Sequence, residues 1–336
     1  MLDACQDTKI ICLTPVKNEA WILDTFLSCA SLWADQIIIA DQMSTDGSRE
    51  IAIKYPKVTL IDNACGSFNE PERQALLIDA ARKINCDRRV LIALDADEIL
   101  VGNVQGIVCD KFSQFDKGTV ITFDWFNVQP DRHTCWKSNT KMPFGFIDDE
   151  TKHCGATIHS TRVPDPGRSH HHPVTDIFVL HLQYIDWDRM RSKHRWYECF
   201  ERINHQEKAS IEIYRQYHHM YSFRNRLRRF NLRKEWLSLY NEMGIDALAF
   251  IKDPCYRWDT EILEMIKKYG ADKFINLDIW DSPVFANSKE ILKFANQGIA
   301  ERLVWTLVRF YLKLTQLVYP NFFLQYVDRL IGKVYH

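Results

Sequence analysis

The sequence predicts an α/β fold in which a mostly parallel sheet is flanked by helices. Strand-like and helix-like segments alternate up to about residue 100, which is the pattern of parallel βαβ units. The strand-like segments are short continuous apolar runs, typical of a sheet that helices cover on both faces. Three of the four expected strands also end in polar or charged residues, and ligands of such sheets bind beyond the carboxyl ends of the strands.

Each element of this first part has its own signal. Four apolar runs predict strands at residues 10–13, 36–40, 58–61 and 90–94. Phe26 and Trp33 share one face of the helix expected after the first strand. A short helix through Tyr55 is expected after a loop rich in turn residues. Asn69 and Glu72 resemble a capping box, which predicts the start of a third helix.

The pattern changes beyond the fourth strand. Shorter, aromatic-rich strands are expected up to residue 182, and a helical, basic stretch begins near residue 187. We therefore expect one domain over residues 1–187, with halves at about 1–100 and 101–187, and a mostly helical, basic region at 188–336. A last helix at about 299–319 carries a narrow polar stripe on an apolar surface. That helix either lies in a membrane interface or packs its apolar face against the domain.

Charge and cysteine usage restrict the class of protein. The net charge is -1, so the molecule as a whole is not an electrostatic nucleic-acid binder, and no nucleic-acid partner is expected. Residues 1–150 carry 15 basic and 23 acidic residues, and the rest carries 28 and 21, so the first part suits a cation and the second an anion, unless both are solvated faces. Ten single cysteines without a C-x-x-C pair and the lack of a secretory signal predict a cytoplasmic protein with free thiols.

Acidic residues end the fourth expected strand. Asp95 and Asp97 follow it directly, where like charges are costly unless a cation or hydrogen-bond donors are present. A hard divalent ion with oxygen ligands relieves this repulsion and keeps substrate phosphates in its shell. The glycine-rich motifs of dinucleotide and P-loop sites are absent. The pattern therefore favours a metal that carries a diphosphate.

Three segments carry a family resemblance. They are Ile-Cys-Leu-Thr-Pro-Val-Lys-Asn-Glu-Ala at 11–20, Ile-Ala-Asp-Gln-Met-Ser-Thr-Asp-Gly-Ser at 39–48 and Leu-Asp-Ala-Asp-Glu at 94–98. In residues, order and spacing they resemble the signature segments of family 2 glycosyltransferases with the GT-A fold. The resemblance implies a metal-dependent, inverting transfer of a sugar from a nucleotide-diphosphate sugar, such as a UDP-sugar, to a glycan or lipid-linked acceptor. The implied metal is Mg²⁺ or Mn²⁺.

The resemblance also implies roles for single residues. Asp41 stands where a carboxylate accepts a hydrogen bond from the base, and Asp97 where the metal binds. Gln42 and Met43 stand where the family commonly has Asp-Gly, which leaves the shape of that loop open. The positions implied to hold the nucleotide or donor sugar are Thr14, Pro15, Lys17, Asn18, Glu19, Asp95 and Ala96.

Four further candidates each keep an alternative. His181 either completes the metal shell, as the family implies, or is a core histidine of a strand. Arg73 either meets the nucleotide or is a solvated arginine on a helix. Asp149, or its neighbour Asp148, is either the general base that deprotonates the acceptor or a solvated loop carboxylate.

Two other functions remain open from the sequence. The run ending at Asp95 also resembles the aspartate nucleophile segment of haloacid-dehalogenase-type phosphohydrolases, which are metal dependent. A non-catalytic module that binds nucleotide sugars or glycans is the second alternative. Contact of the protein with the inner face of a membrane is a further possibility, through the helix at about 299–319.

Overall fold

The structure is a computed structural model of a chain that divides into two compact units. The first unit holds Met1–Ile185 and Phe230–Lys252, and the second holds Asp186–Arg229 and Asp253–His336. The second unit therefore does not contain all residues from 188 onwards, because residues 230–252 belong to the first unit. The residues that the structure describes are 7–64, 69–108, 112–138, 141–155, 160–222, 229–253, 255–282, 285 and 299–333, with the backbone alone for 299–305.

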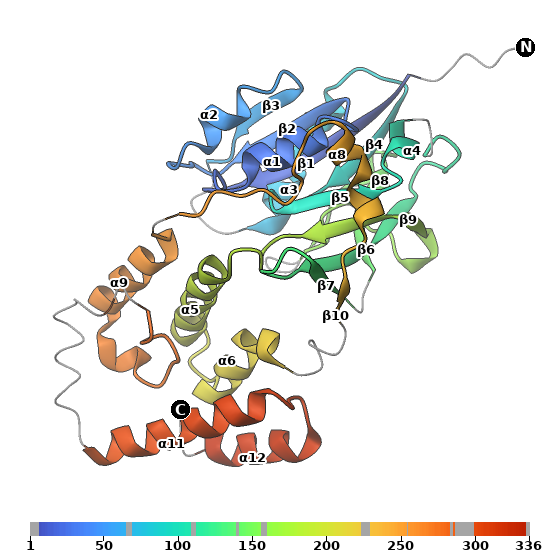
Figure 1. The fold of residues 1–336 in the computed structure, drawn as a ribbon. Coiled ribbons are helices and arrows are strands. Elements are labelled where there is room, and N and C mark those ends of the chain that lie inside the picture. The colour runs from blue at the N-terminus through green and yellow to red at the C-terminus, as the bar shows by residue number, and fades with distance from the viewer. Residues whose placement is uncertain are drawn as a thin grey trace, which may run out of the picture. The chain divides into compact units, whose positions relative to one another are not determined.

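A sheet with flanking helices organises the first unit and confirms the predicted α/β class (Figure 1). Four strands pair in parallel in the order β3-β2-β1-β4, and each contains one of the predicted apolar runs or most of it. Parallel pairing places the carboxyl ends of these strands at one edge of the sheet. The strands are β1 (Thr8–Val16), β2 (Gln36–Asp41), β3 (Val58–Asp62) and β4 (Arg88–Ala93).

Helices cover both faces of this parallel part. Successive side chains of a strand point to opposite faces, so neighbouring residues of β1 enter different cores. Cys12 packs in the core that contains Phe26 of α1, and Leu13 packs in the core that contains Leu77 of α3. α2 lies on the same face as α1. The helices are α1 (Leu23–Ala30), α2 (Ser48–Ala52) and α3 (Glu70–Arg82).

The rest of the sheet is mixed. β8 is antiparallel to both β4 and β6, so β6 runs in the direction of β4. β9 pairs in parallel with β6 and antiparallel with β5, and β7 and β10 continue the sheet beyond β6. The carboxyl ends of β4, β6 and β9 therefore point the same way. The strands are β5 (Glu98–Gly102), β6 (Val120–Val128), β7 (Thr134–Lys137), β8 (Met142–Ile147), β9 (His171–His181) and β10 (Arg229–Asn231).

Aromatic packing explains why residues 230–252 belong to the first unit. The ring of Trp236 lies 4.8 Å from that of Phe126 on β6 and 4.6 Å from that of Phe178 on β9, between centroids. The backbone amide of Ile251 donates to the carbonyl of Trp21 at 2.7 Å. The short elements here and after β5 are α4 (Gln105–Val108), η3 (Lys234–Leu237) and α8 (Ser238–Glu242).

The second unit is helical. Asp186 caps its first helix, because the Asp186 carboxylate accepts from the amides of Asp188 and Arg189 at 3.1 and 3.2 Å. Cys199, Ile213, Ile262 and Phe274 form its core. The helix expected at about 299–319 is present as α11. The helices are α5 (Trp187–Asn204), α6 (Ser210–Tyr217), η2 (His219–Tyr221), α9 (Arg257–Tyr269), η4 (Ala271–Phe274), α11 (Ile299–Gln316) and α12 (Phe322–Gly332).

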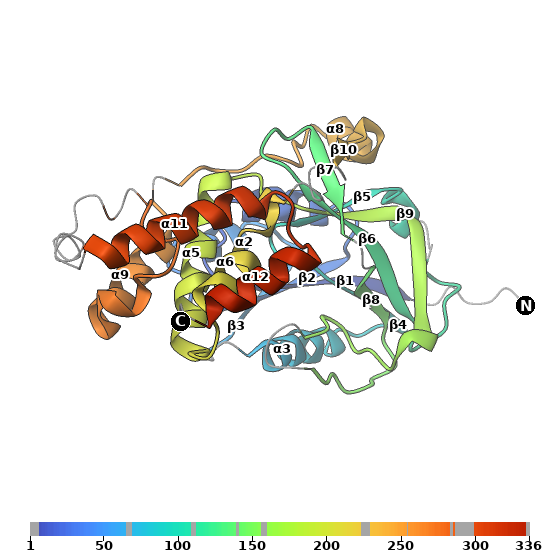
Figure 2. The same ribbon diagram turned by 90° about the horizontal axis from the view of Figure 1, so that it is seen from below.

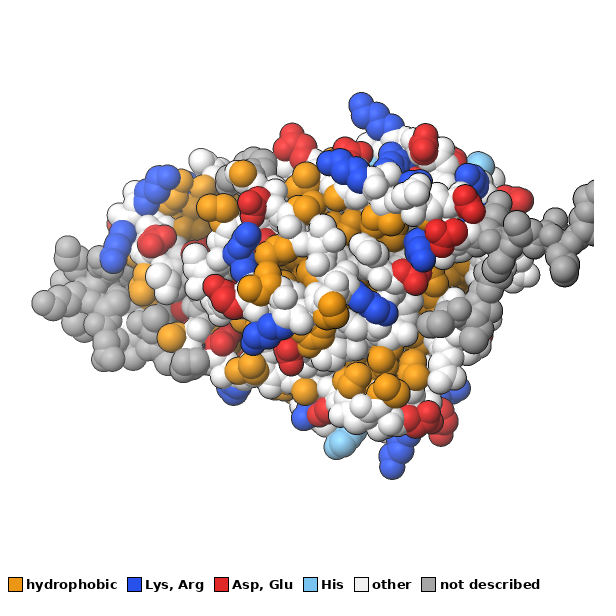
Figure 3. All heavy atoms as spheres, turned by 90° about the horizontal axis from the view of Figure 1, so that it is seen from above, with side chains coloured by type: hydrophobic (Ala, Val, Ile, Leu, Met, Phe, Trp, Pro, Cys, Tyr) orange, Lys and Arg blue, Asp and Glu red, His pale blue; other side chains and the backbone are white. Residues whose placement is uncertain are grey.

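Two further features concern the distribution of surface charge and the apolar character of the helices. Acidic and basic side chains are interspersed over the surface seen in Figure 3. None of the helices in the described part of the chain combines the length and the apolar character that a membrane crossing requires.

Candidate functional site

The loops that follow β1, β2 and β4 meet at the carboxyl edge of the sheet. Val16 of β1 pairs with Asp41 of β2, and the amide of Leu94 donates to the carbonyl of Leu13 at 3.0 Å. Pro15 pairs with Ala40 next to this edge. The side chain of Thr14, in contrast, is fully buried with its hydroxyl 3.6 Å from Cys12 Sγ, so it faces the core.

Hydrogen bonds join the loop after β1 to the loop after β2. The amide of Asn18 donates to Ser44 Oγ at 2.8 Å, and Asn18 Oδ1 accepts from the amide of Thr45 at 2.8 Å. The amide of Glu19 donates to Ser48 Oγ at 2.9 Å. Lys17, between these contacts and the strand, is exposed. Asn18 thus connects two loops and is not the N-cap of α1, which begins after Ile22.

In the loop after β2, one residue has a left-handed backbone conformation at the position where the glycosyltransferase family commonly has glycine. Met43 has a φ of 54°, a region that side chains other than glycine rarely adopt. Gly47 has a φ of 96° and precedes α2. The question of loop shape that Gln42 and Met43 raise is therefore answered by the backbone: Met43 takes a glycine-like conformation.

Asp41 is buried at this edge with one satisfied oxygen. Its Oδ2 accepts from Arg49 Nη1 at 2.7 Å and from the amide of Ser44 at 3.2 Å. Its Oδ1 is buried without a hydrogen-bond partner in the structure. A buried acceptor of this kind is costly unless a donor reaches it.

Asp95 and Glu98 share one guanidinium. Arg162 Nη2 lies 2.7 Å from Asp95 Oδ2, and Arg162 Nη1 contacts Glu98 Oε2. Burial raises the pKa of Glu98 against the opposing effect of Arg162. Burial alone would lower the pKa of Arg162, but the carboxylates of Asp95 and Glu98 outweigh it and raise the pKa. Arg162 also lies over the ring of Phe144, 5.1 Å from its centroid.

Asp97 faces His181 across the pairing of β5 with β9. The amide of Leu182 donates to the carbonyl of Asp97 at 2.8 Å, and this bond holds the backbone next to His181 against that of Asp97. Asp97 Oδ2 lies 3.6 Å from His181 Nε2, and both side chains are about one-tenth exposed. The ring of Trp125 stacks on that of His181 at 4.8 Å between centroids.

The hydrogen bonds of Asn127 indicate which nitrogen of His181 is protonated. Asn127 Oδ1 lies 3.1 Å from His181 Nδ1 and also accepts from Gln183 Nε2 at 3.3 Å. Because this oxygen accepts from Gln183, it favours the tautomer of His181 that carries its proton on Nδ1. In the neutral imidazole, Nε2 then presents its lone pair toward the Asp97 carboxylate. Two acceptors that face each other fit a cation between them.

The donor set suits a divalent metal in chemistry and in charge. Carboxylate oxygen with imidazole nitrogen is a common ligand set for Mn²⁺ and related ions. When Asp95, Asp97 and Glu98 are all ionised, a single guanidinium leaves a surplus of negative charge. Among the described residues, no group of three or more His, Cys, Asp and Glu side chains is arranged to hold a metal ion. Asp97 and His181 are therefore at most part of a coordination shell.

Asp148 and Asp149 lie at the other edge of the sheet. The amide of Asp148 donates to the carbonyl of Arg89, at the amino end of β4, because β8 runs antiparallel to β4. The Asp148 carboxylate is buried against Arg82, with Arg82 Nη2 at 2.8 Å. Asp149 is exposed and accepts from the amide of Thr151 at 2.9 Å. The structure does not bring the expected general base to Asp97.

Two other candidates differ in their placement. Ala96 is buried between the two aspartates and joins the core with its side chain. Arg73 lies in the first turns of α3, the helix that follows the carboxyl end of β3.

Arg162, Glu98 and Asn127 contact the candidate residues although the sequence patterns assign no role to them. Glu98 directly follows the Asp-Ala-Asp segment, so its position was the one available signal. Arg162 is 64 residues from Glu98 in the chain, and Asn127 is 54 residues from His181. No local pattern marks partners at that separation.

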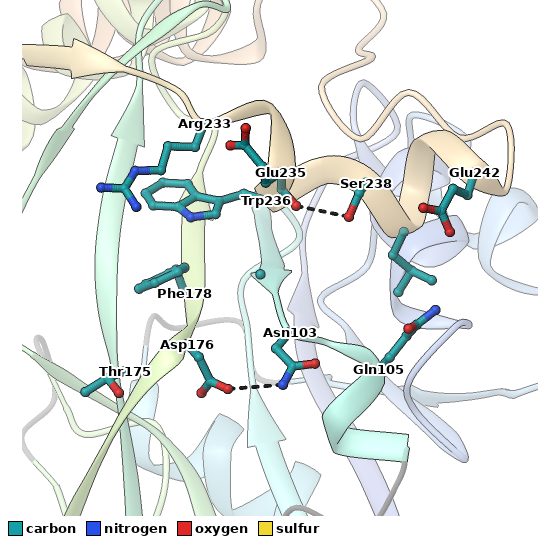
Figure 4. Close-up of a pocket in the computed structure, with 12 residues that line it drawn as sticks. Asn103, Gln105, Thr175, Asp176, Phe178, Arg233, Glu235, Trp236, Ser238 and Glu242 are labelled. Atoms are coloured by element: carbon teal, nitrogen blue, oxygen red, sulfur yellow. Dashed lines mark hydrogen bonds between the residues drawn. The ribbon is translucent and has the colours of Figure 1, made fainter.

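Two cavities of the first unit are lined by other residues than these. One of about 500 Å³ opens beside Trp236, Phe178 and the end of β5 at Gly102. In Figure 4 the side chain of Arg233 lies beside the Trp236 ring, and Asn103 bonds to Asp176, at 3.1 Å. β5 runs from Glu98 to Gly102, so this cavity lies at the opposite end of β5 from Glu98. A second cavity of about 670 Å³ is lined by Arg132, Leu232 and Leu248, among other residues.

Comparisons with known proteins find partial structural likeness. No protein-family model and no curated protein matches the chain. Glucosyl-3-phosphoglycerate synthase from Mycobacterium tuberculosis, solved with Mn²⁺, UDP and glucosyl-3-phosphoglycerate, is 18% identical with a TM-score of 0.25 over 35% of this chain and 44% of the synthase. The chain thus spans less than half of that enzyme's length.

Two other solved structures show a similar degree of likeness. 4-Diphosphocytidyl-2C-methyl-D-erythritol synthase is 8% identical, with a TM-score of 0.27 over 44% of this chain and 74% of that one. A mannose-1-phosphate geranyltransferase from Thermus thermophilus is 16% identical, with a TM-score of 0.26 over 44% and 51% of the two chains. At these scores the likeness assigns neither a family nor an activity.

Proposed function

We propose that the protein is a metal-dependent glycosyltransferase that uses a nucleotide-diphosphate sugar, with a UDP-sugar as donor and a glycan or lipid-linked acceptor. The observation that carries the proposal is the pair Asp97–His181, at 3.6 Å, beside the sheet edge where the loops after β1 and β2 meet. The three sequence segments that resemble family 2 glycosyltransferases all include residues at this edge.

In this proposal the loops after β1 and β2 hold the nucleotide. The buried and unpartnered Asp41 Oδ1 supports a hydrogen bond from the base at that position. Asn18 and Glu19 shape the same wall through their bonds to Ser44 and Ser48. Lys17 is exposed beside them, where it can meet a phosphate or ribose.

Asp97 and His181 would hold Mg²⁺ or Mn²⁺, with the diphosphate and water in the remaining positions. When bound, the metal would neutralise charge that develops on the departing nucleotide diphosphate. Asn127 holds the imidazole of His181 in the tautomer that can ligate. Arg162 holds the carboxylate of Asp95 in place, at 2.7 Å, beside the ligands.

Removing one ligand tests the proposal. We expect UDP-glucose or another UDP-sugar to raise the melting temperature of the protein only when Mn²⁺ is present, because a ligand that binds the native state alone stabilises it. In Asp97→Asn this Mn²⁺-dependent rise should be lost. Asp116→Asn, at an exposed aspartate away from the edge, is the matched control and should behave as the native protein.

Two outcomes would contradict the proposal. One is Asp97→Asn with an undiminished Mn²⁺-dependent shift for the same donor. The other is a covalent phosphate on Asp95 after incubation with a phosphomonoester, which would instead favour a phosphohydrolase.

A further inference from the structure

Exposed apolar side chains are concentrated on α11 and α12 of the second unit. Phe322 and Phe323 at the start of α12 are 84% and 69% exposed, and Leu307 and Phe310 of α11 are 66% and 62% exposed. Isolated exposed apolar residues are normal in proteins, but a contiguous group of large ones marks an interaction surface.

These side chains lie on one side of a two-helix layer. Leu307, Phe310 and Leu314 follow the i, i+3, i+7 spacing of one helical face. The opposite face of α11, with Val308 and Leu312, packs against α6. α12 packs on α6 as well, where Gly332 closely approaches Ala209.

Both helices thus turn one face to α6 and the other away from it. Figure 2 shows α11 and α12 side by side, with α6 behind them. The exposed stripe of α12, which includes Phe322 and Tyr326, therefore continues that of α11. We call this surface, formed by the exposed residues of α11 and α12, the outer face.

Arg215 of α6 holds the two helices in this orientation. Its guanidinium lies 2.9 Å from Asp328 Oδ2 of α12 and 2.9 Å from Gln316 Oε1 of α11. Tyr311 donates to Asp328 at 2.8 Å across the two helices. Because these hydrogen bonds lie on the inner side, neither helix can rotate its apolar stripe inward without breaking them.

Within residues 306–333, whose side chains the structure describes, the exposed charges have one sign. Lys313, Arg329 and Lys333 are exposed. The one acidic residue between 306 and 333, Asp328, is buried in its pair with Arg215. A second copy joined by two-fold symmetry would place cations against cations. An anionic lipid surface meets both the apolar stripe and its basic rim.

We propose that the outer face of α11 and α12 binds the surface of an anionic lipid bilayer. The helices lie in the interface, with Phe310, Phe322 and Phe323 at the boundary between headgroups and acyl chains, and with Lys313 and Arg329 on lipid phosphates. This goes beyond the proposed transfer of a sugar and does not depend on it, because every residue of the outer face lies outside the candidate site.

Sedimentation of the full chain with vesicles tests the proposal. Vesicles that contain phosphatidylglycerol should retain the protein, pure phosphatidylcholine vesicles should retain it at least tenfold less, and added salt should weaken the retention. The double variant Phe322→Ser/Phe323→Ser should lose retention at least tenfold. Ile53→Ser, at an apolar residue 70% exposed on the first unit, is the matched control and should be retained as the native protein is.

Melting temperature and donor binding distinguish loss of the surface from loss of the fold. Both should remain unchanged in the double variant, because the replaced side chains are exposed. The charge variant Lys313→Glu/Arg329→Glu should lose the preference for anionic vesicles as a second line of support. The proposal is overturned if the native protein ignores anionic vesicles, or if it dimerises in solution and the Phe322→Ser/Phe323→Ser variant abolishes that dimer.

Discussion

The imidazole of His181 is held from two sides. Asn127 Oδ1 lies 3.1 Å from Nδ1 and favours a proton there, and Trp125 stacks on the ring. The free lone pair on Nε2 is therefore aimed at Asp97 before any ligand arrives. Partners that orient a metal-ligating histidine in this way influence metal affinity although they do not touch the metal.

Asn127→Ala removes this orientation. We expect Mn²⁺ affinity, measured by calorimetric titration, to fall by roughly 10–100-fold. Asn127→Asp keeps an acceptor for Nδ1 and should retain affinity. Asn103→Ala replaces an exposed asparagine at the other end of β5 and should have no effect. Equal Mn²⁺ affinity in Asn127→Ala and the native protein would rule out His181 as a ligand held by Asn127.

Residue by residue, the sequence could predict the strand ends but not their distant partners. Asp41, Asp95 and Asp97 each follow an apolar run, so a local pattern marks them. Arg162 reaches the carboxylate of Asp95 from 67 residues away, and nothing in its own surroundings marks it. The sequence predicts Asp148 as a general base or a solvated loop carboxylate, but Arg82, 66 residues away, buries it in an ion pair at the other edge.

At the scale of elements, the pairing of β5 with β9 depends on Gly102. Its φ is 90°, and an added Cβ would lie 2.4 Å from the backbone carbonyl oxygen of Asp176 on β9. Backbone cannot yield as a flexible side chain can. Glycine at position 102 therefore permits both the left-handed backbone conformation and the close approach of the two strands.

Gly102→Ala and Gly47→Ala separate these two contributions. Gly47 also has a positive φ, but a Cβ there meets nothing within 4 Å. Gly47→Ala should cost about 1–2 kcal/mol of unfolding free energy from the backbone conformation alone. Gly102→Ala should cost a further ~1–3 kcal/mol from the clash. Urea unfolding measures both, and equal losses in the two variants would contradict the close approach to Asp176.

The parallel strands could be predicted and the later ones could not, for a physical reason. β1 to β4 alternate with helices, and connections of this kind have few possible arrangements. β6 to β9 pair across long and irregular connections with mixed directions. The direction of β8 decides that Asp148 leaves the sheet at the amino end of β4, and no local signal sets that direction.

At the scale of the whole molecule, the second unit buries several titratable side chains in its interior. Glu198, His218 and Asp278 are buried together, with His218 Nε2 at 3.2 Å from Asp278 Oδ2. Burial raises the pKa of Glu198 to about 8. Burial would raise the pKa of Asp278 as well, but its hydrogen bond to His218 and the nearby Arg309 outweigh that effect and lower it.

These shifts predict how stability depends on pH. A carboxyl whose pKa is higher in the folded state binds its proton more tightly there, so folding weakens as pH rises from the ordinary value of 4.5 toward 8. Glu198→Gln removes this contribution. In urea unfolding at pH 8 the variant should be more stable than the native protein by more than about 1.4 kcal/mol, the equivalent of one pKa unit. Near pH 4.5 the two should be similar, and a difference independent of pH would contradict a protonated Glu198.

The return of residues 230–252 to the first unit sets a limit on dissecting the protein. The polypeptide leaves the sheet-containing unit after residue 185, comes back to it at residue 230 and leaves it again after residue 252. A single truncation therefore cannot yield the complete first unit. A fragment that stops at residue 187 would lack Trp236 and uncover the rings of Phe126 and Phe178. An autonomous version would have to splice residues 230–252 onto the first 185 through an artificial linker.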